Sequence, residues 1–233
     1  MSILLSIKQS VRKIIPKYWM KSYSQEGEDM ILRRYFETQQ KGFFVDIGAH
    51  HPKRFSNTYA FYKMGWQGLN VDAMPGSMIA FNKQRKKDIN IEAAISNETA
   101  EMTYYIFRNP ALNSFSKELA DYRESLGIGC DVISSVTITT KKLEEILDTY
   151  LPVNQVIDFM SIDVEGLDLQ VLKSNNWDKY CPRIILSEIL TSSLNDLIND
   201  PITIFLASKG YHMYGKCINT VIYRHNTEME STL

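Results

Sequence analysis

The chain has 233 residues, of which 44% are hydrophobic and 23% are charged, and this length favours one domain with short appendages. The 26 basic and 27 acidic residues give a formal net charge of −1, which argues against a general nucleic-acid binder, since that class usually carries a basic excess. The three cysteines, Cys130, Cys181 and Cys217, are far apart and odd in number. They form neither a zinc-ligand pair nor a disulfide framework, so we expect a reducing, cytoplasmic compartment.

The first 23 residues are basic, with apolar side chains at helical spacing. We expect an amphipathic helix there, either packed on the domain or bound through residues 1–22 to an anionic membrane surface. In the second case the protein would be peripheral to the inner face of the membrane. A secretory signal is disfavoured because the basic residues follow the apolar ones, and no apolar run reaches the ~18 residues of a membrane span.

From residue 24 to about 224, short apolar runs alternate with helical patterns, and residues 225–233 form a polar tail. Strands are expected at 43–47, 68–72, 89–95, 102–107, 136–139, 156–164 and 183–189, with a closing hairpin at 211–223. Helices are expected at 58–64, 75–85, 141–150, 165–173 and 201–208. This order predicts one α/β domain with a mostly parallel sheet, helices on both faces and an antiparallel C-terminal edge hairpin.

In such a sheet a ligand lies beyond the carboxyl ends of the strands, so the residues there are the first candidates for a site. The first strand run contains Asp46 and is followed by Gly48, His50 and His51, and the second strand ends in Asp72. Gly48 lets a ligand approach the backbone, and Asp72, roughly 20 residues further on, is placed to accept both hydroxyls of a ribose. Asp46 is either a ligand contact or a buried acid that caps a helix.

The turn after the first strand lacks a phosphate cradle. A dinucleotide-binding turn needs the pattern G-x-G-x-x-G, but only Gly48 is present here, with His50 and Lys53 at the other two positions. An adenosine-containing ligand without phosphates fits this combination, and S-adenosylmethionine is the common one. Its positive charges would favour a carboxylate such as Asp46 near the turn.

Two further acids, Asp163 and Glu165, follow the most apolar strand, and Glu188 ends the next one. One of them can act as general base toward a hydroxyl or bind a divalent cation, so the presence of a metal is left open. Glu165 has an alternative role as an acid stabilised at a helix N-terminus. His51 is the second choice for the base, with a structural hydrogen bond as its alternative.

Six short segments occur in a fixed order along the chain: SQEGED at 24–29, FVDIGA at 44–49, SNT at 56–58, GWQG at 65–68, AIS at 94–96 and IDVEG at 162–166. In this order they resemble the FkbM-type methyltransferases, and the similarity runs from about residue 24 to 188. The resemblance implies a class I, Rossmann-like methyltransferase that uses S-adenosylmethionine. It also implies methylation of an oxygen of a sugar or of a sugar-containing natural product.

The resemblance implies seven cofactor contacts: Gln25, Glu28, Asp46, Gly48, His50, Asp72 and Ser96. The first two would close over the cofactor as a lid. Asp46 and Gly48 would face its methionine end, and Ser96 would lie near the adenine. Asp72 stands where the family commonly has Glu before Pro, and His50 stands where it frequently has Asn.

Residues 104–135 have no counterpart in the minimal alternation and are rich in aromatic and amide side chains. They form either a substrate cover that recognises a sugar or an ordinary cover helix with core aromatics. The basic run at 83–87 is predicted to be a solvated helix end. The expected partner is a small-molecule or glycan acceptor, such as a polysaccharide precursor, and not a nucleic acid.

Two other functions remain open. One is a nucleotide-dependent enzyme on a similar sheet, such as a dehydrogenase, against which the missing glycines argue. The other is a non-catalytic methyltransferase-like subunit that binds a partner. The joint presence of Asp46, Gly48, Asp72, Asp163 and Glu165 argues against such a decayed site.

Overall fold

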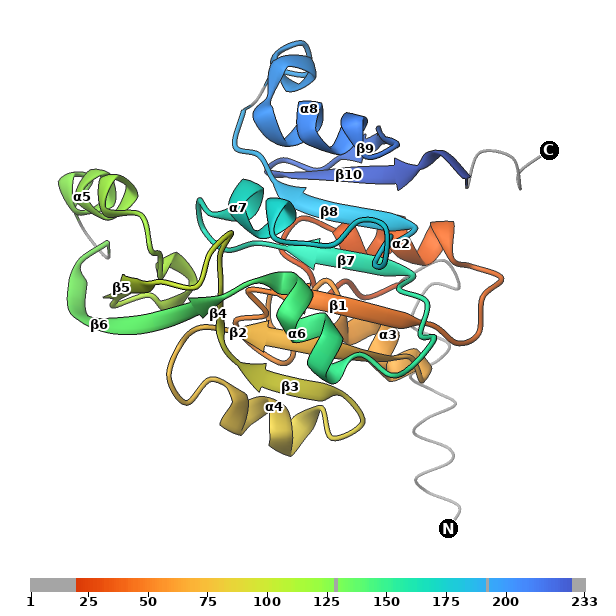
Figure 1. Cartoon of the computed structure of the whole chain (residues 1–233), viewed down its shortest axis with the longest axis horizontal. Helices are drawn as coiled ribbons and strands as arrows, with labels where there is room; N and C mark the ends of the chain where they lie inside the picture. The colour runs from red at the N-terminus through yellow and green to blue at the C-terminus, as the bar shows by residue number, and fades with distance from the viewer. Residues whose placement is uncertain (1–19, 128–129, 192, 228–233) are drawn as a thin grey trace, which may run out of the picture.

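The computed structural model describes residues 20–127, 130–191 and 193–227. The expected N-terminal helix and its membrane contact therefore lie almost wholly outside the described residues. The main sheet has seven strands in the order β3-β2-β1-β7-β8-β10-β9 (Figure 1). Their bounds are β1 Phe43–Ile47, β2 Gln67–Asp72, β3 Ile89–Glu92, β7 Phe159–Ile162, β8 Ile184–Glu188, β9 Tyr211–Lys216 and β10 Thr220–His225.

The direction of the strands confirms the predicted sheet. The pairs β3–β2, β2–β1, β1–β7 and β7–β8 are parallel, whereas β10 runs antiparallel to both β8 and β9. Strand order reverses between β1 and β7, because the chain builds outward from β1 to β3 and then returns to the other side of β1. A crevice at such a switch point is where open α/β sheets bind their ligands.

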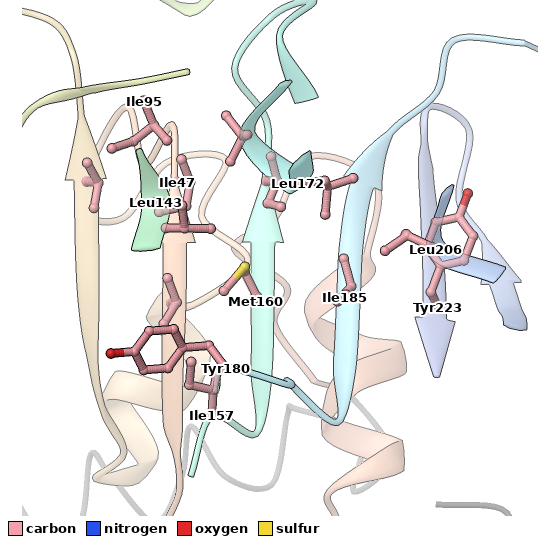
Figure 2. Close-up of a cluster of buried hydrophobic side chains, with 14 of the residues drawn as sticks. Ile47, Ile95, Leu143, Ile157, Met160, Leu172, Tyr180, Ile185, Leu206 and Tyr223 are labelled. Atoms are coloured by element: carbon pink, nitrogen blue, oxygen red, sulfur yellow. The ribbon is translucent and has the colours of Figure 1, made fainter. Parts of the chain in front are cut away.

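Helices cover both faces of the main sheet, so its strands are near-continuous apolar runs. Their bounds are α2 Glu28–Tyr35, α3 Tyr59–Met64, α4 Met78–Gln84, α6 Leu143–Tyr150, α7 Asp168–Lys173 and α8 Pro201–Ser208. Helices α6, α7 and α8 pack on one face, and α2 and α3 pack on the other. Figure 2 shows the first of these layers, with Ile47, Met160 and Ile185 on strands and Leu143, Leu172 and Leu206 on helices.

A second, three-stranded sheet has the order β4-β6-β5 and projects from the side of the main sheet (Figure 1). Its strands are β4 Ala94–Ile95, β5 Glu101–Phe107 and β6 Val132–Lys141. Between β5 and β6 the chain forms the 3₁₀ turn η1 Pro110–Leu112 and helix α5 Lys117–Ser125. A further 3₁₀ turn, η2 Asp196–Asn199, precedes α8.

The expected single strand at 89–95 is wrong, because the chain leaves the main sheet at Ala93. The Ala93 N–H donates to the Asp72 carbonyl oxygen at 3.0 Å, after which β4 pairs with β6. An apolar run carries no signal for such a change of partner. Among the residues that the structure describes, no helix is long and apolar enough to cross a membrane.

Candidate active site

A cavity of about 490 Å³ opens at the carboxyl ends of β1, β2, β7 and β8. The loops after β1 and β2, the segment before α2, the η1 region and the β9–β10 turn complete its walls. The predicted site residues that line it are Gln25, Glu28, Gly48, His50, His51, Asp72, Asp163 and Glu165. The structure thus brings most of the predicted site together at the switch point of the sheet.

Gly48 is required by the close approach of β1 and β7. Its φ is 82°, and a Cβ atom there would lie 1.8 Å from the carbonyl oxygen of Asp163. The two strand ends are further joined because the Asp163 N–H donates to the Ile47 carbonyl oxygen at 3.0 Å. Any side chain at position 48 would push apart the two strands that carry the site.

Asp72 connects the loops after β1 and β2. One carboxylate oxygen accepts the His50 N–H and the other accepts the Met74 N–H, both at 2.8 Å. Burial raises the pKa of Asp72, although these two bonds oppose the shift. A carboxylate has about four lone-pair positions, so Asp72 retains room to accept two ligand hydroxyls.

His50 contributes to this loop through its backbone. Its φ of 51° lies in the left-handed region, which Asn adopts more readily than most residues. That preference accounts for the Asn that the resembling family frequently has here. Burial lowers the pKa of His50 to about 4, so the ring is neutral at pH 7.

The His51 ring caps the turn that follows it. Its Nδ1 accepts the backbone N–H groups of Lys53 and Arg54 at 3.0 and 2.9 Å. In the neutral ring the proton must then sit on Nε2, which makes that nitrogen a donor. Burial, together with the nearby Arg54 and Lys53 charges, lowers the pKa of His51. This geometry equips His51 to donate to a ligand rather than to take its proton.

Glu165 is held by the connection between β5 and β6. Its carboxylate pairs with the Arg123 guanidinium of α5, and its carbonyl oxygen accepts from Ser114 Oγ at 2.7 Å. The φ values of Glu165 and Gly166 are 52° and 103°, so the expected helix at 165–173 begins only at Asp168. The acid expected at a helix N-terminus instead occupies a left-handed turn that attaches α5 to the end of β7.

Asp163 and Glu188 form an acidic wall beside this turn. Among the described residues, no hydrogen bond or ion pair reaches either side-chain carboxylate. Asp163 is exposed toward the cavity, and Glu188 is partly buried. Burial and the nearby charges of Glu188 and Glu165 raise the pKa of Asp163 well above its ordinary value. Burial, Glu165 and Asp168 raise the pKa of Glu188 to about 8.

Residues 46–213 match the family model described as the methyltransferase FkbM domain. The chain belongs to this methyltransferase family. The match covers most of the chain and confirms the resemblance that six short segments indicated. Among curated proteins, no sequence matches the chain.

Asp46 of the methyltransferase lies behind the cavity wall rather than in its lining. Its carboxylate accepts from Thr58 Oγ1 at 2.8 Å, and Thr58 in turn accepts from the Arg85 guanidinium at 3.1 Å. Burial raises the pKa of Asp46 to about 6. The structure therefore gives Asp46 the role of fixing the loop that carries His50 and His51.

Arg85 corrects the prediction that the whole run 83–87 is a solvated helix end. Its side chain is 0% exposed and forms an ion pair with Asp88, which is equally buried, at 2.7 Å. It also donates to the Pro52 carbonyl oxygen at 3.1 Å and lies over the Tyr62 ring. Sequence spacing could not separate this arginine from its solvated neighbours, because Asp88 is close in sequence but Pro52 and Tyr62 belong to distant segments.

Of the remaining predicted cofactor contacts, Ser96 lies outside the cavity lining and Glu28 lies in it. The Ser96 N–H is bound to the Lys141 carbonyl oxygen at 3.0 Å, and Ala93 and Ile95 line the cavity instead. Glu28 lines the cavity but is buried and accepts from Thr220 Oγ1 at 3.1 Å. This bond joins the start of α2 to the start of β10, and the Asn219 N–H donates to the Glu26 carboxylate at 2.7 Å, which ties the segment before α2 to the β9–β10 turn.

Arg54 is a lining residue that the sequence analysis missed. It is the one lysine or arginine among the described residues that line the cavity, and it lies 3.3 Å from His50 Nε2. Its position shortly after the strand-end glycine was the available signal. Tyr104, Asn113 and Phe115 also line the cavity, which favours the substrate-cover interpretation of 104–135.

The described residues contain no group of three or more His, Cys, Asp or Glu side chains arranged to hold a metal ion. Of the acids at the ends of β7 and β8, Glu165 is paired with Arg123 of α5.

Proposed function

We propose that this methyltransferase uses S-adenosylmethionine to methylate a hydroxyl of a sugar-containing acceptor. The observation that carries the proposal is that two acids in different environments, Asp72 and Asp163, line the same cavity. Asp72 is held by backbone N–H groups and keeps free lone pairs, whereas Asp163 has no partner among the described residues. The first suits a ribose and the second suits a reacting hydroxyl.

The residues present fit the adenosyl cofactor. Asp72 would accept the ribose hydroxyls, and the apolar side chains of Ala93 and Ile95 would lie against the base. The cavity volume of about 490 Å³ falls within the ~300–1,000 Å³ of typical ligand pockets. When bound, S-adenosylmethionine supplies an electrophilic methyl group on a positively charged sulfonium. Arg54 would pair with its carboxylate, and the acidic wall would favour its net positive charge.

Asp163 is the proposed general base. The acceptor oxygen forms a bond to the methyl carbon as the sulfur–carbon bond breaks, and the sulfur keeps that electron pair. The hydroxyl proton passes to the Asp163 carboxylate. A cation in the same cavity favours the ionised form of Asp163 and so prepares it to take this proton. Glu165 is less suited because Arg123 already occupies its carboxylate.

Tyr104, Phe115 and Asn113 support a sugar as acceptor. The two aromatic rings lie 4.6 Å apart between centroids and line the cavity, where a ring face can stack on a sugar. Asn113 uses its amide oxygen to hold the Phe107 N–H at 2.9 Å. This bond fixes the amide that faces the cavity.

Mass spectrometry of glycosides incubated with the protein and S-adenosylmethionine tests the proposal. We expect a methylated glycoside and an equal amount of S-adenosylhomocysteine from the wild type, and at least about 100-fold less of both from the Asp163→Asn variant. Cofactor binding without transfer to any glycoside would favour a non-catalytic subunit. Binding of NAD in place of S-adenosylhomocysteine would favour a nucleotide-dependent enzyme.

A further inference from the structure

A second cavity, of about 630 Å³, lies next to the active-site cavity. Its walls come from α5, α7, the segment after β8 and the start of α8, and we call it the α5–α8 groove. Leu119, Tyr122, Leu169, Leu190 and Ile202 are its main apolar residues. The proposed cofactor contacts lie outside its lining.

The groove and the active-site cavity meet at Glu188, which lines both. Gly166, which also lines the groove, directly follows Glu165 of the active-site cavity. The ion pair between Glu165 and Arg123 of α5 holds this junction in place. A molecule seated in the groove can therefore extend a polar end toward Asp163.

The apolar part of the groove is open. Tyr122 is 60% exposed and Leu190 is 61% exposed, and the two stand on different walls. Large apolar side chains gathered on the walls of one groove mark a surface that an apolar group covers on binding. The groove shares Glu188 with the cavity where the reaction is proposed, so an apolar group of the acceptor itself is placed to cover it.

Every charged side chain that lines the groove within the described part of the chain is acidic: Glu118, Asp168, Glu188 and Asp200. Of these four acids, Asp168 lies near enough to Glu188 for its charge to act on that carboxyl group. Burial raises the pKa of Asp168 to about 7, and the charges of Glu165 and Asp168 add to burial in raising the pKa of Glu188. A phosphate or carboxylate placed here would meet repulsion, and Arg123, whose positive charge reaches Glu188, is already paired with Glu165. Hydroxyl groups, in contrast, can bond to either protonation state of these acids.

We propose that the α5–α8 groove is the acceptor subsite, and that it takes an uncharged glycoside whose sugar carries an apolar aglycone. The sugar end would lie at Glu188 with a hydroxyl toward Asp163, and the aglycone would cover Tyr122 and Leu190. Sugar nucleotides and sugar phosphates would be rejected. This inference rests on the proposed function, because the groove is assigned to the methyl acceptor.

Binding of three probes to the full chain tests this assignment, by ligand-observed NMR with and without saturating S-adenosylhomocysteine. The probes are octyl β-D-glucoside, octyl β-D-glucuronide and glucose. Compared with the glucoside, the glucuronide carries a negative charge, and glucose lacks the apolar octyl group. We expect the glucoside to bind at least tenfold more tightly than either of the others. The double variant Tyr122→Ala/Leu190→Ser should lose at least fivefold of that affinity.

Ile79→Ser is the matched control, because Ile79 is 76% exposed on α4 and does not line the groove. It should bind the glucoside as the wild type does. Equal or tighter binding of the glucuronide, wild-type affinity in the double variant, or no binding of the glucoside would each overturn the assignment. Calorimetry with S-adenosylhomocysteine reports separately on the proposed function. If S-adenosylhomocysteine did not bind, the proposed function would fail, but the glucoside result would still stand.

Discussion

The two sides of the active-site cavity hold their acids in different ways. On the β2 side, Asp72 is fixed by two backbone N–H donors, and both come from loops that end at the cavity. On the β7–β8 side, Asp163 and Glu188 crowd each other with no side-chain partner among the described residues, and burial raises the pKa of both. The comparison teaches that a carboxylate fixed by protein N–H donors can hold a ligand in place, whereas a carboxylate without a protein donor is available to exchange a proton.

The Asp163→Asn substitution should have the largest effect. We expect turnover with an octyl glycoside acceptor to fall by about 10²–10⁴-fold, the usual contribution of a general base. Affinity for S-adenosylhomocysteine should change less than about threefold, because Asp72 remains. Release of S-adenosylhomocysteine measures the first quantity and calorimetry the second. Glu165→Gln is the comparison variant, and a larger loss of turnover there would transfer the role of base to Glu165.

Gly48→Ala should push apart the ends of β1 and β7, where Gly48 and Asp163 meet. We expect a loss of about 2–4 kcal/mol in the free energy of unfolding, because the new Cβ meets the Asp163 carbonyl oxygen and adopts a left-handed φ. Urea unfolding measures it. Gly65→Ala is the control, since Gly65 has a φ of 98° but open space around it. Equal losses in both variants would show that backbone strain alone acts at Gly48.

The positions of these acids could be predicted from sequence because strand ends are marked by apolar runs and glycine. That pattern placed Asp72, Asp163, Glu165 and Gly48 in one cavity. The pattern could not say which acid is paired. The partner of Glu165 is Arg123, which is distant in sequence and reaches the site from α5, in the connection between β5 and β6.

Two other sequence predictions were wrong for a similar reason: the single strand at 89–95 and the solvated helix end at 83–87. After Ala93 the chain changes its pairing partner from β2 to β6, and Arg85 is buried against Pro52 and Thr58 as well as its near neighbour Asp88. Apart from Asp88, these partners lie in segments that a short sequence window does not compare. Secondary structure from periodicity was reliable for the main sheet, whose strands are buried on both faces.

Asp72→Ala should weaken cofactor binding on the β2 side of the cavity. We expect affinity for S-adenosylhomocysteine to fall by about 10- to 100-fold, since hydrogen bonds to a charged group contribute roughly 1.5–3 kcal/mol. Glu92→Ala is the matched control, because Glu92 also accepts an N–H of this loop, from Gly76 at 2.7 Å, but does not line the cavity. Calorimetry should find its affinity unchanged, and an equal loss in both variants would mean that loop order alone is measured.

Glu188→Gln should change the pH dependence of stability. The folded protein binds the Glu188 proton more tightly than the unfolded chain, because its pKa rises from 4.5 to about 8 on folding. The free energy of unfolding therefore falls as pH rises from about 4.5 to 8. Urea unfolding at pH 5, 6.5 and 8 should show a shallower fall in the variant. Parallel curves for variant and wild type would contradict the raised pKa.

Ser96→Ala should have the smallest effect, less than about twofold on S-adenosylhomocysteine affinity. Its hydroxyl donates to the Asn97 side chain at 3.2 Å and lies outside the cavity. Calorimetry provides the measurement, with Asp72→Ala as the positive control. A loss comparable to that control would return Ser96 to the cofactor contacts that the resemblance implied.

Calorimetry of the wild-type chain with S-adenosylhomocysteine and, separately, with NAD tests the central claim most directly, because the two ligands share adenosine and differ in the pyrophosphate. We predict that one S-adenosylhomocysteine binds per chain, at least about 100-fold more tightly than NAD, since a single glycine turn offers ribose contacts without a phosphate cradle. Tighter binding of NAD, or no binding of S-adenosylhomocysteine, would contradict it.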